Sequence, residues 1–443
     1  MHKFISGYLV LFFFTFCLSI NTYGNDESQN TNDSISKLNL QSLLIHLVKN
    51  DEEIKRFKSQ AEQAKAQHSQ SKGLYYPTMD LLADGGREKI DNDFRPDTNE
   101  NRYNITLRAN QLITDFGKTL DTIDRSGIIL EQANARLEAT RQQLMLEGVK
   151  AYINIVKTRE RLDSARQSEA RIKKLTGIEK TLVKKGAGLS SDVLQAASQL
   201  AGAMALRVFA EGELNLAKNR FQAVFFHFPT SKEILQFKDI EFPYKKLPIM
   251  LEDAIAIADK QNPELLITMY DTQIAQKEID IAKTAFYPQL NLFAEAINKY
   301  NDEGQMGHRD ELSAGVEFRY NLFNGGGDRA ALRSALANQK AASFHTGHVK
   351  KIIKEQVSNS WDQLSTLNQR SELLDQQADI VKNFLILAKK ERKMGTRSLL
   401  DVLTGEINYI NAVATSIATR QDTKIAAYNL LFAMGSINLQ LFE

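Results

Sequence analysis

The chain has 443 residues, of which 25% are charged, and its formal net charge is +2. This near-balance of charge provides no basic surface for nucleic acid and no acidic surface for cationic partners. After residue 30 we expect no run that approaches the ~20 apolar residues of a membrane-spanning helix, which excludes an ordinary helical membrane protein.

The first 24 residues have the layout of a secretory signal peptide. Lys3 precedes a nearly continuous apolar run from Tyr8 to Ile20, and Thr22-Tyr23-Gly24 places small residues at a cleavage site. The alternative is an N-terminal membrane anchor, for which the apolar run is short. Cleavage after Gly24 would remove Cys17, the single cysteine, so we expect neither disulfides nor thiolate metal sites in the mature chain.

The rest of the chain is a tandem repeat. The segment 113–117 matches 322–326, and 186–194 matches 395–403, both displaced by 209 residues. A third pair, 75–77 and 286–288, is displaced by 211 residues. We therefore predict a signal peptide at 1–24, a first repeat at 25–226, a proline-punctuated connector at 227–248 and a second repeat at 249–443.

Each repeat is predicted to contain a helix, two strands, a very long helix, a turn and a returning helix. The first helix spans about 38–72, and the long helices span about 116–185 and 327–393. Apolar residues at sevenfold spacing mark a coiled-coil seam on the first long helix: Phe116, Ile123, Leu130, Leu137, Leu144 and Ala151. A helix of ~70 residues is roughly 100 Å long, and two helices of ~35 residues span the same length. This arithmetic predicts a two-layered helical wall rather than a globule.

The predicted strands alternate in polarity. From Glu311 to Tyr320, charged or small residues alternate with apolar ones, and 105–110 and 290–296 alternate likewise, with Phe293 as an exception. About ten alternating residues match a tilted strand that crosses a bilayer. The alternative is an amphipathic hairpin on a soluble sheet. Four strands cannot close a barrel and open edges are not tolerated in lipid, so a transmembrane reading requires several chains. The polar loops at 91–102 and 301–309 would then face the cell exterior.

The strand-to-helix turns and the helix-tip turns resemble those of the TolC-like outer-membrane efflux family, and the resemblance covers nearly the whole mature chain. It implies a mainly α fold with transmembrane β: long antiparallel coiled-coil helices form a periplasmic tunnel, and a homotrimer forms one 12-stranded barrel. It also implies an outer-membrane channel, the exit duct of a tripartite export system, which passively conducts secreted protein or small molecules. The implied partners are a periplasmic adaptor and an inner-membrane ABC or proton-driven transporter.

The resemblance also assigns gate residues. The family turn Gly-Thr-Arg-x-x-x-Asp-Val reads Gly395 to Val402 here. Arg397 accordingly belongs to the ionic network that keeps the tunnel closed, and Asp401 lines the constriction. The matching Asp192 of the first repeat is expected to pair with Arg397 across a subunit boundary. Two family positions differ: Thr404 replaces an aspartate, which makes the constriction less negative, and Arg392 replaces a tyrosine.

Simpler roles remain open for these residues. Asp192 and Asp401 follow turns and are suited to helix N-caps or first-turn positions. The tip residues expected to contact the adaptor are Gly186, Gly188, Leu189, Gly395 and Thr396. The alternative for the glycines is that they only reverse the chain.

Other functions have less support from the sequence. Gly325-Gly326-Gly327 lacks the Lys-Ser/Thr of a phosphate-binding loop, and His345 and His348 have no apparent third metal ligand. No nucleophile–base–acid signature appears, so we predict neither an enzyme nor a cofactor nor a metal site. The main alternative is an exported coiled-coil adaptor or a cell-surface adhesin.

Overall fold

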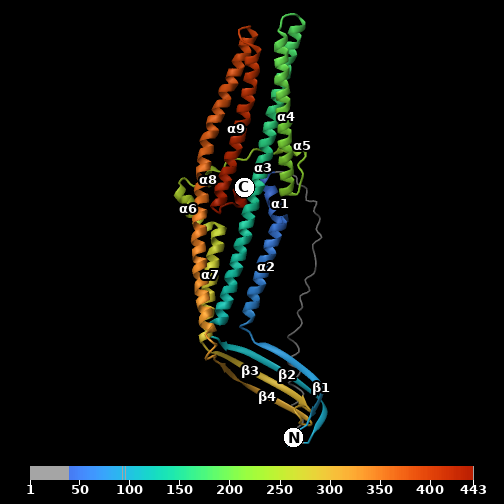
Figure 1. Ribbon diagram of the computed structural model, residues 1–443, viewed down its shortest axis with the longest axis vertical. Helices are drawn as coiled ribbons and strands as arrows, with labels where there is room; N and C mark the ends of the chain where they lie inside the picture. Colours follow the sequence, from blue (N-terminus) through green and yellow to red (C-terminus); the bar gives the residue numbers. More distant parts are fainter. Residues whose placement is uncertain (1–38, 92, 95, 443) are drawn as a thin grey trace. The chain divides into compact units, whose positions relative to one another are not determined.

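The structure is a computed structural model that describes residues 39–91, 93, 94 and 96–442. The predicted signal peptide, residues 1–24, lies outside the described residues. The described residues belong to the same structural unit (Figure 1).

The same order of elements occurs twice along the described chain. The first series consists of α1 (Leu40–Asn50), α2 (Glu52–Gly73), β1 (Thr78–Ile90), β2 (Thr98–Thr114), α3 (Lys118–Lys184) and α4 (Ser190–Phe225). The second series consists of α6 (Leu251–Gln261), α7 (Pro263–Lys283), β3 (Gln289–Tyr300), β4 (His308–Arg319), α8 (Gly327–Lys393) and α9 (Leu399–Ala433). Short elements complete the described chain: the helix α5 (Ser231–Gln236) and the 3-10 turns η1 (Tyr244–Lys246), η2 (Thr284–Phe286) and η3 (Leu439–Phe442).

The expectation of a single helix over 38–72 is wrong, because the chain breaks between α1 and α2. Asp51 has an extended backbone, with φ −63° and ψ 135°, and its carboxylate accepts hydrogen bonds from the backbone N–H of Glu53 and Ile54. Asn262 caps α7 in the same way after α6, followed by Pro263 at the first helical position. An Asx N-cap therefore begins a new helix in both series.

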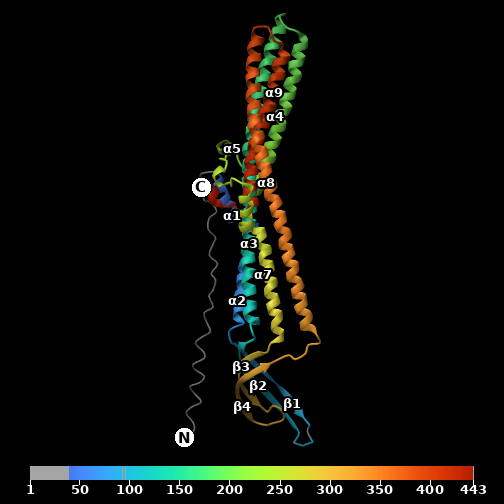
Figure 2. The same ribbon diagram turned by 90° about the vertical axis from the view of Figure 1, so that its left-hand side faces the viewer.

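The two long helices have the predicted bounds within two residues. Both α3 and α8 contain 67 residues. Figures 1 and 2 show two shorter helices following one another along each long helix: α2 and α4 beside α3, and α7 and α9 beside α8. The predicted wall of one long helix against two short ones is present.

The coiled-coil seam of α3 continues beyond the residues that the sequence pattern singled out. Its first member, Phe116, is 51% exposed, whereas Leu137 and Ala151 are buried. The same sevenfold series then continues through buried positions: Thr158, Ala165, Ile172 and Glu179. Burial is concentrated in the half of α3 that packs against α4 and α9. The other half packs against α2 and α7, and there the seam residues Ile123 and Leu130 are only half-buried.

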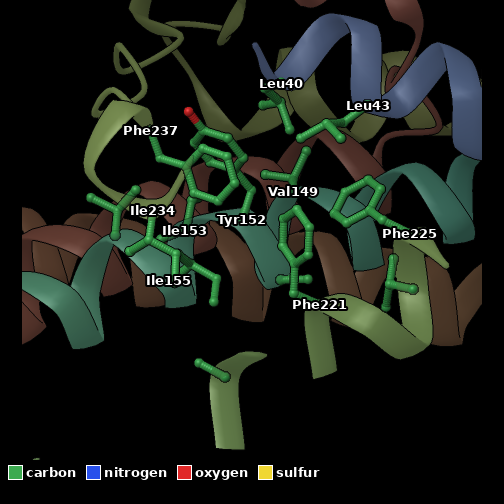
Figure 3. Packing of buried hydrophobic residues seen from close by; sticks show 14 of the residues in the cluster. Leu40, Leu43, Val149, Tyr152, Ile153, Ile155, Phe221, Phe225, Ile234 and Phe237 are labelled. Carbon is green, nitrogen blue, oxygen red and sulfur yellow. The ribbon is translucent and has the colours of Figure 1, made fainter. Parts of the chain in front are cut away.

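The largest hydrophobic cluster lies where α1, α3, α4, α5 and the end of α9 meet (Figure 3). The rings of Tyr152 and Phe237 lie 5.0 Å apart, and those of Phe221 and Phe225 lie 4.6 Å apart. The Tyr152 hydroxyl donates to the carbonyl of Lys238 at 3.0 Å, and burial raises the pKa of this tyrosine. The connector is thereby anchored on the long helix midway between the sheet and the tips.

The four strands form one antiparallel sheet in the order β1-β2-β3-β4. The pairing places Leu81, Leu107, Ala296 and Leu312 in one row across the sheet. The neighbouring row contains Asp80, Arg108, Glu295 and Ser313, so the two faces differ in polarity along these rows.

The apolar face of this sheet is the exposed one, which is the reverse of a soluble sheet. Leu312, Val316 and Phe318 are 86%, 58% and 63% exposed, while their chain neighbours Glu311 and Glu317 are half-buried. An apolar exterior with a polar, half-covered interior is the pattern of a transmembrane barrel wall. The predicted β component of the fold is therefore present, as is the predicted alternation.

Phe293, the aromatic residue on the polar face, is explained by its partner across the sheet. It pairs directly with Gly315 of β4, and a Cβ at Gly315 would lie 3.1 Å from two carbons of the Phe293 ring. The ring thus covers the strand glycine.

We expect Gly315→Ala to lower the free energy of unfolding by about 1 kcal/mol more than Gly86→Ala does, because the ring must move to admit a methyl group. Gly86 of β1 is the matched control, since a Cβ there meets no atom within 4 Å. Thermal unfolding in detergent measures the difference. Equal melting temperatures for the two variants would contradict this account of Phe293.

The expectation of no spanning-length apolar helix after residue 30 is wrong for α4. By length and composition alone, this helix is long and apolar enough to cross a membrane, and only 17% of its apolar window is buried. Small uncharged residues make the stretch apolar without a run of large side chains. Most of the apolar surface of α4 is therefore exposed in a single chain.

Candidate functional site: the tips of the two helical hairpins

The two turns that reverse the chain have the same backbone geometry. The first lies between α3 and α4 and the second between α8 and α9. Gly186 and Gly395 have φ of +74° and +82°, a conformation that favours glycine. The backbone N–H of Ala187 donates to the carbonyl of Leu182 at 2.9 Å, and that of Thr396 donates to the carbonyl of Glu391 at 3.1 Å. This is the Schellman ending of a helix, so chain reversal accounts for both glycines.

The other predicted tip residues, Gly188, Leu189 and Thr396, come directly after these two glycines in the chain. Gly188 lies close to the end of α3, because a Cβ there would be 3.0 Å from Val183 Cγ2. Leu189 is 65% exposed, and Thr396 donates its hydroxyl to the carbonyl of Glu391 at 3.0 Å. The tips thus present one exposed apolar side chain, that of Leu189, beside glycine backbone that no side chain covers.

Asp192 and Asp401 occupy first-turn positions, and neither is an N-cap. The N-cap of α4 is Leu189, and that of α9 is Ser398, whose hydroxyl accepts from Asp401 N–H at 3.1 Å. A carboxylate in the first turn interacts favourably with the positive end of the helix dipole. The N-cap alternative is therefore wrong and the first-turn alternative holds.

Within one chain, Arg397 is paired inside its own hairpin. Its guanidinium lies 3.0 Å from the carboxylate of Glu391 and 3.6 Å from that of Asp401, and 5.0 Å above the ring of Phe384. Two predicted gate residues, Arg397 and Asp401, are thus brought together. Asp192 belongs to the other hairpin, and its predicted contact with Arg397 crosses a subunit boundary.

Arg392, the departure from the family pattern, connects the two hairpins. It donates to Glu179 of α3 at 3.0 Å and to the carbonyl of Arg397 at 3.3 Å. Glu179 is only 4% exposed and is the last member of the α3 heptad series described above. Arg392 is likewise the next position in a sevenfold series of buried residues on α8: Ser371, Ala378 and Leu385. Each seam therefore ends in a charged residue, and these two charges meet.

A second buried carboxylate lies further from the tips. Glu406 of α9 is fully buried, and it is paired with Arg171 of α3 at 2.9 Å and with Lys389 of α8. We call Arg171, Lys389 and Glu406 the buried triad. It joins three helices from both hairpins. Sequence reasoning missed it, because the burial of Glu406 depends on which helices cover it.

The tips thus combine exposed turns with two sets of ionic contacts: the Arg392–Glu179 pair near the turns and the buried triad further from them. Charged pairs that hold helices together are suited to a two-state device, because a partner can replace a few such bonds. Within the described part of the chain, no three His, Cys, Asp or Glu side chains are grouped so as to hold a metal ion.

Comparison with known proteins identifies the family. The family model described as "Outer membrane efflux protein" matches residues 43–224 and 254–436. The outer membrane efflux protein BepC of Brucella suis is 22% identical over 75% of this chain and 72% of its own length. The alkaline protease secretion protein AprF of Pseudomonas aeruginosa is 21% identical over 78% of this chain and 72% of its own.

A solved structure shares the fold. The CmeC outer membrane channel of Campylobacter jejuni superposes with a TM-score of 0.75 at 19% identity, covering 90% of this chain and 85% of that one. The chain therefore belongs to the outer membrane efflux protein family, and it is an outer-membrane protein whose helices lie in the periplasm.

Proposed function

We propose that this protein is the exit duct of a tripartite export system. It would assemble as a homotrimer and passively conduct cargo from an inner-membrane ABC or proton-driven transporter, through a periplasmic adaptor, to the cell exterior. The observation that carries this proposal is the sheet, with its exposed apolar face, its half-covered polar face and its edge strands β1 and β4. Three chains would contribute four strands each and close one twelve-stranded barrel.

The proposed cargo is secreted protein or small toxic compounds, because AprF is named for protease secretion and BepC for efflux. The proposal includes removal of residues 1–24 and the division into repeats at 25–226 and 249–443. An adhesin or an adaptor has no support from the family match, and the barrel-like sheet argues against both.

In the proposed gate, Asp401 of three chains forms an anionic ring at the narrow end, and Asp192 pairs with Arg397 of a neighbouring chain. Like carboxylates around an axis repel one another, so nearby arginines stabilise the closed arrangement. The exposed tip residues Gly186, Gly188, Leu189, Gly395 and Thr396 would receive the adaptor, which outcompetes these contacts.

We expect Arg397→Ala to raise single-channel conductance in planar bilayers several-fold over the wild-type protein, because it removes the cation that holds the carboxylates together. Lys393→Ala is the matched control, since Lys393 is an exposed cation one helical turn before the tip. Its conductance should equal that of the wild type.

Two other outcomes would count against the proposal. Equal, open currents in all three proteins would keep the channel and remove Arg397 from the gate. No current in any of them, from protein shown to be folded, would remove the channel itself.

A further inference from the structure

One cross-strand row on the apolar face of the sheet consists of ring side chains. It crosses β2, β3 and β4 near the strand ends that lie away from the helices (Figure 1), through Tyr103, Tyr300 and His308. The rings of Tyr103 and Tyr300 are stacked 5.4 Å apart, and the ring of His308 lies 4.6 Å from that of Tyr300. The Tyr103 hydroxyl lies 3.2 Å from His308 Nδ1. We call these three residues the outer aromatic row.

The outer aromatic row lies at one boundary of the apolar band. His308 begins β4, and Phe318, which is 63% exposed, stands near the other end of that strand. These two residues are about ten positions apart, which is roughly 33 Å along a strand. At a tilt of about 40° this corresponds to roughly 25 Å across the membrane, the height of the apolar band of an outer-membrane barrel. Because the helices lie in the periplasm, the row marks the boundary toward the cell exterior in the proposed barrel.

The next row toward the bilayer centre contains a carboxylate. Ile105, Asn298 and Asp310 are paired in this row, on the same face as the rings. Asp310 is exposed, and it accepts a hydrogen bond from the Asn298 amide at 2.6 Å. It forms no ion pair within the described part of the chain. A carboxylate beside hydrocarbon is costly without further donors, so a donor from outside the chain is expected here.

A shallow groove adjoins this carboxylate on the same face. Its volume is about 350 Å³, and Asn298 and Asp310 line it at the end nearer the rings. The rest of its lining on this face is apolar and exposed: Ile105, Leu107, Ala296 and Leu312. An apolar groove with polar groups at one end fits an acyl chain and the base of its headgroup.

A cation lies beyond the outer aromatic row. Arg87 of β1 is on the same face, two residues further out than the partner of Tyr103. Arg87 is exposed and donates from Nε to Asn99 at 2.8 Å, but it forms no ion pair among the described residues. Lys89, the next cation on this face, is instead paired with Asp91 at 3.1 Å. Arg87 therefore has guanidinium N–H groups available for an anion, and phosphate suits their geometry.

We propose that this exterior surface binds a phosphorylated glycolipid, a lipid with a sugar headgroup, from the outer leaflet of the membrane. An acyl chain fills the groove, and the sugar packs against the outer aromatic row. Asp310 accepts hydrogen bonds from hydroxyl or amide groups at the base of the headgroup, and Arg87 binds its phosphate. The inference rests on the proposed barrel and adds a lipid site to its exterior.

The chemistry of the surface favours a sugar over an ammonium headgroup. A sugar presents C–H groups that pack on aromatic rings, and its hydroxyls hydrogen-bond to carboxylate, phenol and imidazole groups alike. An ammonium phospholipid also supplies donors to Asp310, but it has no ring hydroxyls for Tyr103, Tyr300 and His308.

Lipid retention by the purified protein tests the site. Protein extracted from membranes is delipidated in detergent and titrated with lipid A, a phosphorylated and acylated disaccharide, or with phosphatidylethanolamine, and bound lipid is counted by native mass spectrometry. Asp310→Asn should weaken lipid A binding about tenfold, because a neutral amide accepts more weakly than a carboxylate. Tyr300→Leu should weaken it about fivefold through loss of the ring. Phe318→Leu is the matched control, a ring on the same face remote from the groove, and should bind as the wild type does.

A second pair of variants tests the phosphate contact. Arg87→Ala should weaken binding of lipid A about tenfold and leave binding of dephosphorylated lipid A unchanged, because only the former loses a charge-assisted hydrogen bond. Lys89→Ala is the matched control, since that cation is already paired within the chain. Equal effects of the two substitutions would overturn the assignment of Arg87.

Other results would overturn the ligand or the site. Retention of phosphatidylethanolamine equal to that of lipid A, and lost in Asp310→Asn, would overturn the sugar headgroup. Equal losses in Tyr300→Leu and Phe318→Leu would mean that lipid packs on the whole exterior without a defined site.

The same samples separate this proposal from the exit duct on which it rests. Native mass spectra report the oligomeric state, and planar bilayers report conductance. Conducting trimers without preference for lipid A overturn the site and leave the exit duct. Monomers that do not conduct overturn the exit duct. Lipid A binding that still depends on Asp310 in such monomers would support the site by itself, and its absence there would overturn both.

Discussion

Replacement of Gly435 by alanine is expected to lower the free energy of unfolding by more than about 4 kcal/mol, among the largest effects of a single substitution. Gly435 ends α9 with φ +73°, and a Cβ there would lie 2.6 Å from both Asn262 Cα and the Gln261 carbonyl oxygen. Those atoms are backbone, so the methyl group cannot be accommodated by a side-chain rotation.

The surroundings of Gly435 increase the cost. Its carbonyl accepts a buried hydrogen bond from the Gln142 amide at 3.1 Å, and the Asn262 amide donates to Ala433 at 2.9 Å. Displacing the end of α9 breaks both bonds and leaves buried polar groups without partners.

Gly326→Ala is the matched control for this prediction. Gly326 also has a positive φ, +82°, but a Cβ there meets no atom within 4 Å. Its substitution should cost only the backbone strain, about 1–2 kcal/mol. Thermal unfolding in detergent compares the two variants. Equal losses would mean that strain alone, and not the close approach to Asn262, makes Gly435 necessary.

The double substitution Arg171→Met, Lys389→Met is expected to destabilise the tip region by about 3–5 kcal/mol, because it leaves the buried carboxylate of Glu406 without a counter-charge. Glu406 is 0% exposed, whereas Arg171 and Lys389 are about one-third exposed. Hydrogen exchange at the ends of α3, α8 and α9 measures the local loss.

A third substitution tests the cause. Adding Glu406→Leu removes the unpaired charge and replaces the buried triad by apolar side chains, which is often neutral or stabilising. The triple variant should recover most of the protection lost by the double variant. No recovery would show that the two cations act through packing rather than through their charge.

The sequence predicted the long helices and β4 well, because their signals are long and periodic. It predicted the first repeat's strands less well, since β2 begins at Thr98, inside the loop expected over 91–102. The bounds of α8 are those expected from residues 327–393, and the alternation over 311–320 coincides largely with β4. The break between α1 and α2 was missed although it had a local signal. Asp51 and Asn262 are both Asx residues separated by 211 residues, one of the displacements of the repeat.

The candidate site was predicted only in part. The tip glycines were found because two copies of one turn can be compared along the chain. Arg397 was assigned through the family resemblance, and its pairing with Asp401 follows from i,i+4 spacing. Glu179 and Glu406 were missed because burial of a charged seam residue depends on which helix covers it. That information belongs to the packing of α3 against α9 rather than to any local pattern.

The edge strands β1 and β4 have a consequence for how the protein reaches its membrane. A chain inserted alone would expose a row of unsatisfied backbone N–H and C=O groups to hydrocarbon along each edge, at a cost of several kcal/mol for each group. In the proposed trimer, insertion would therefore accompany or follow association of the chains. The rate at which barrels appear should depend steeply on the concentration of unassembled subunits, and dilution during refolding should leave the helices formed but the sheets outside the bilayer.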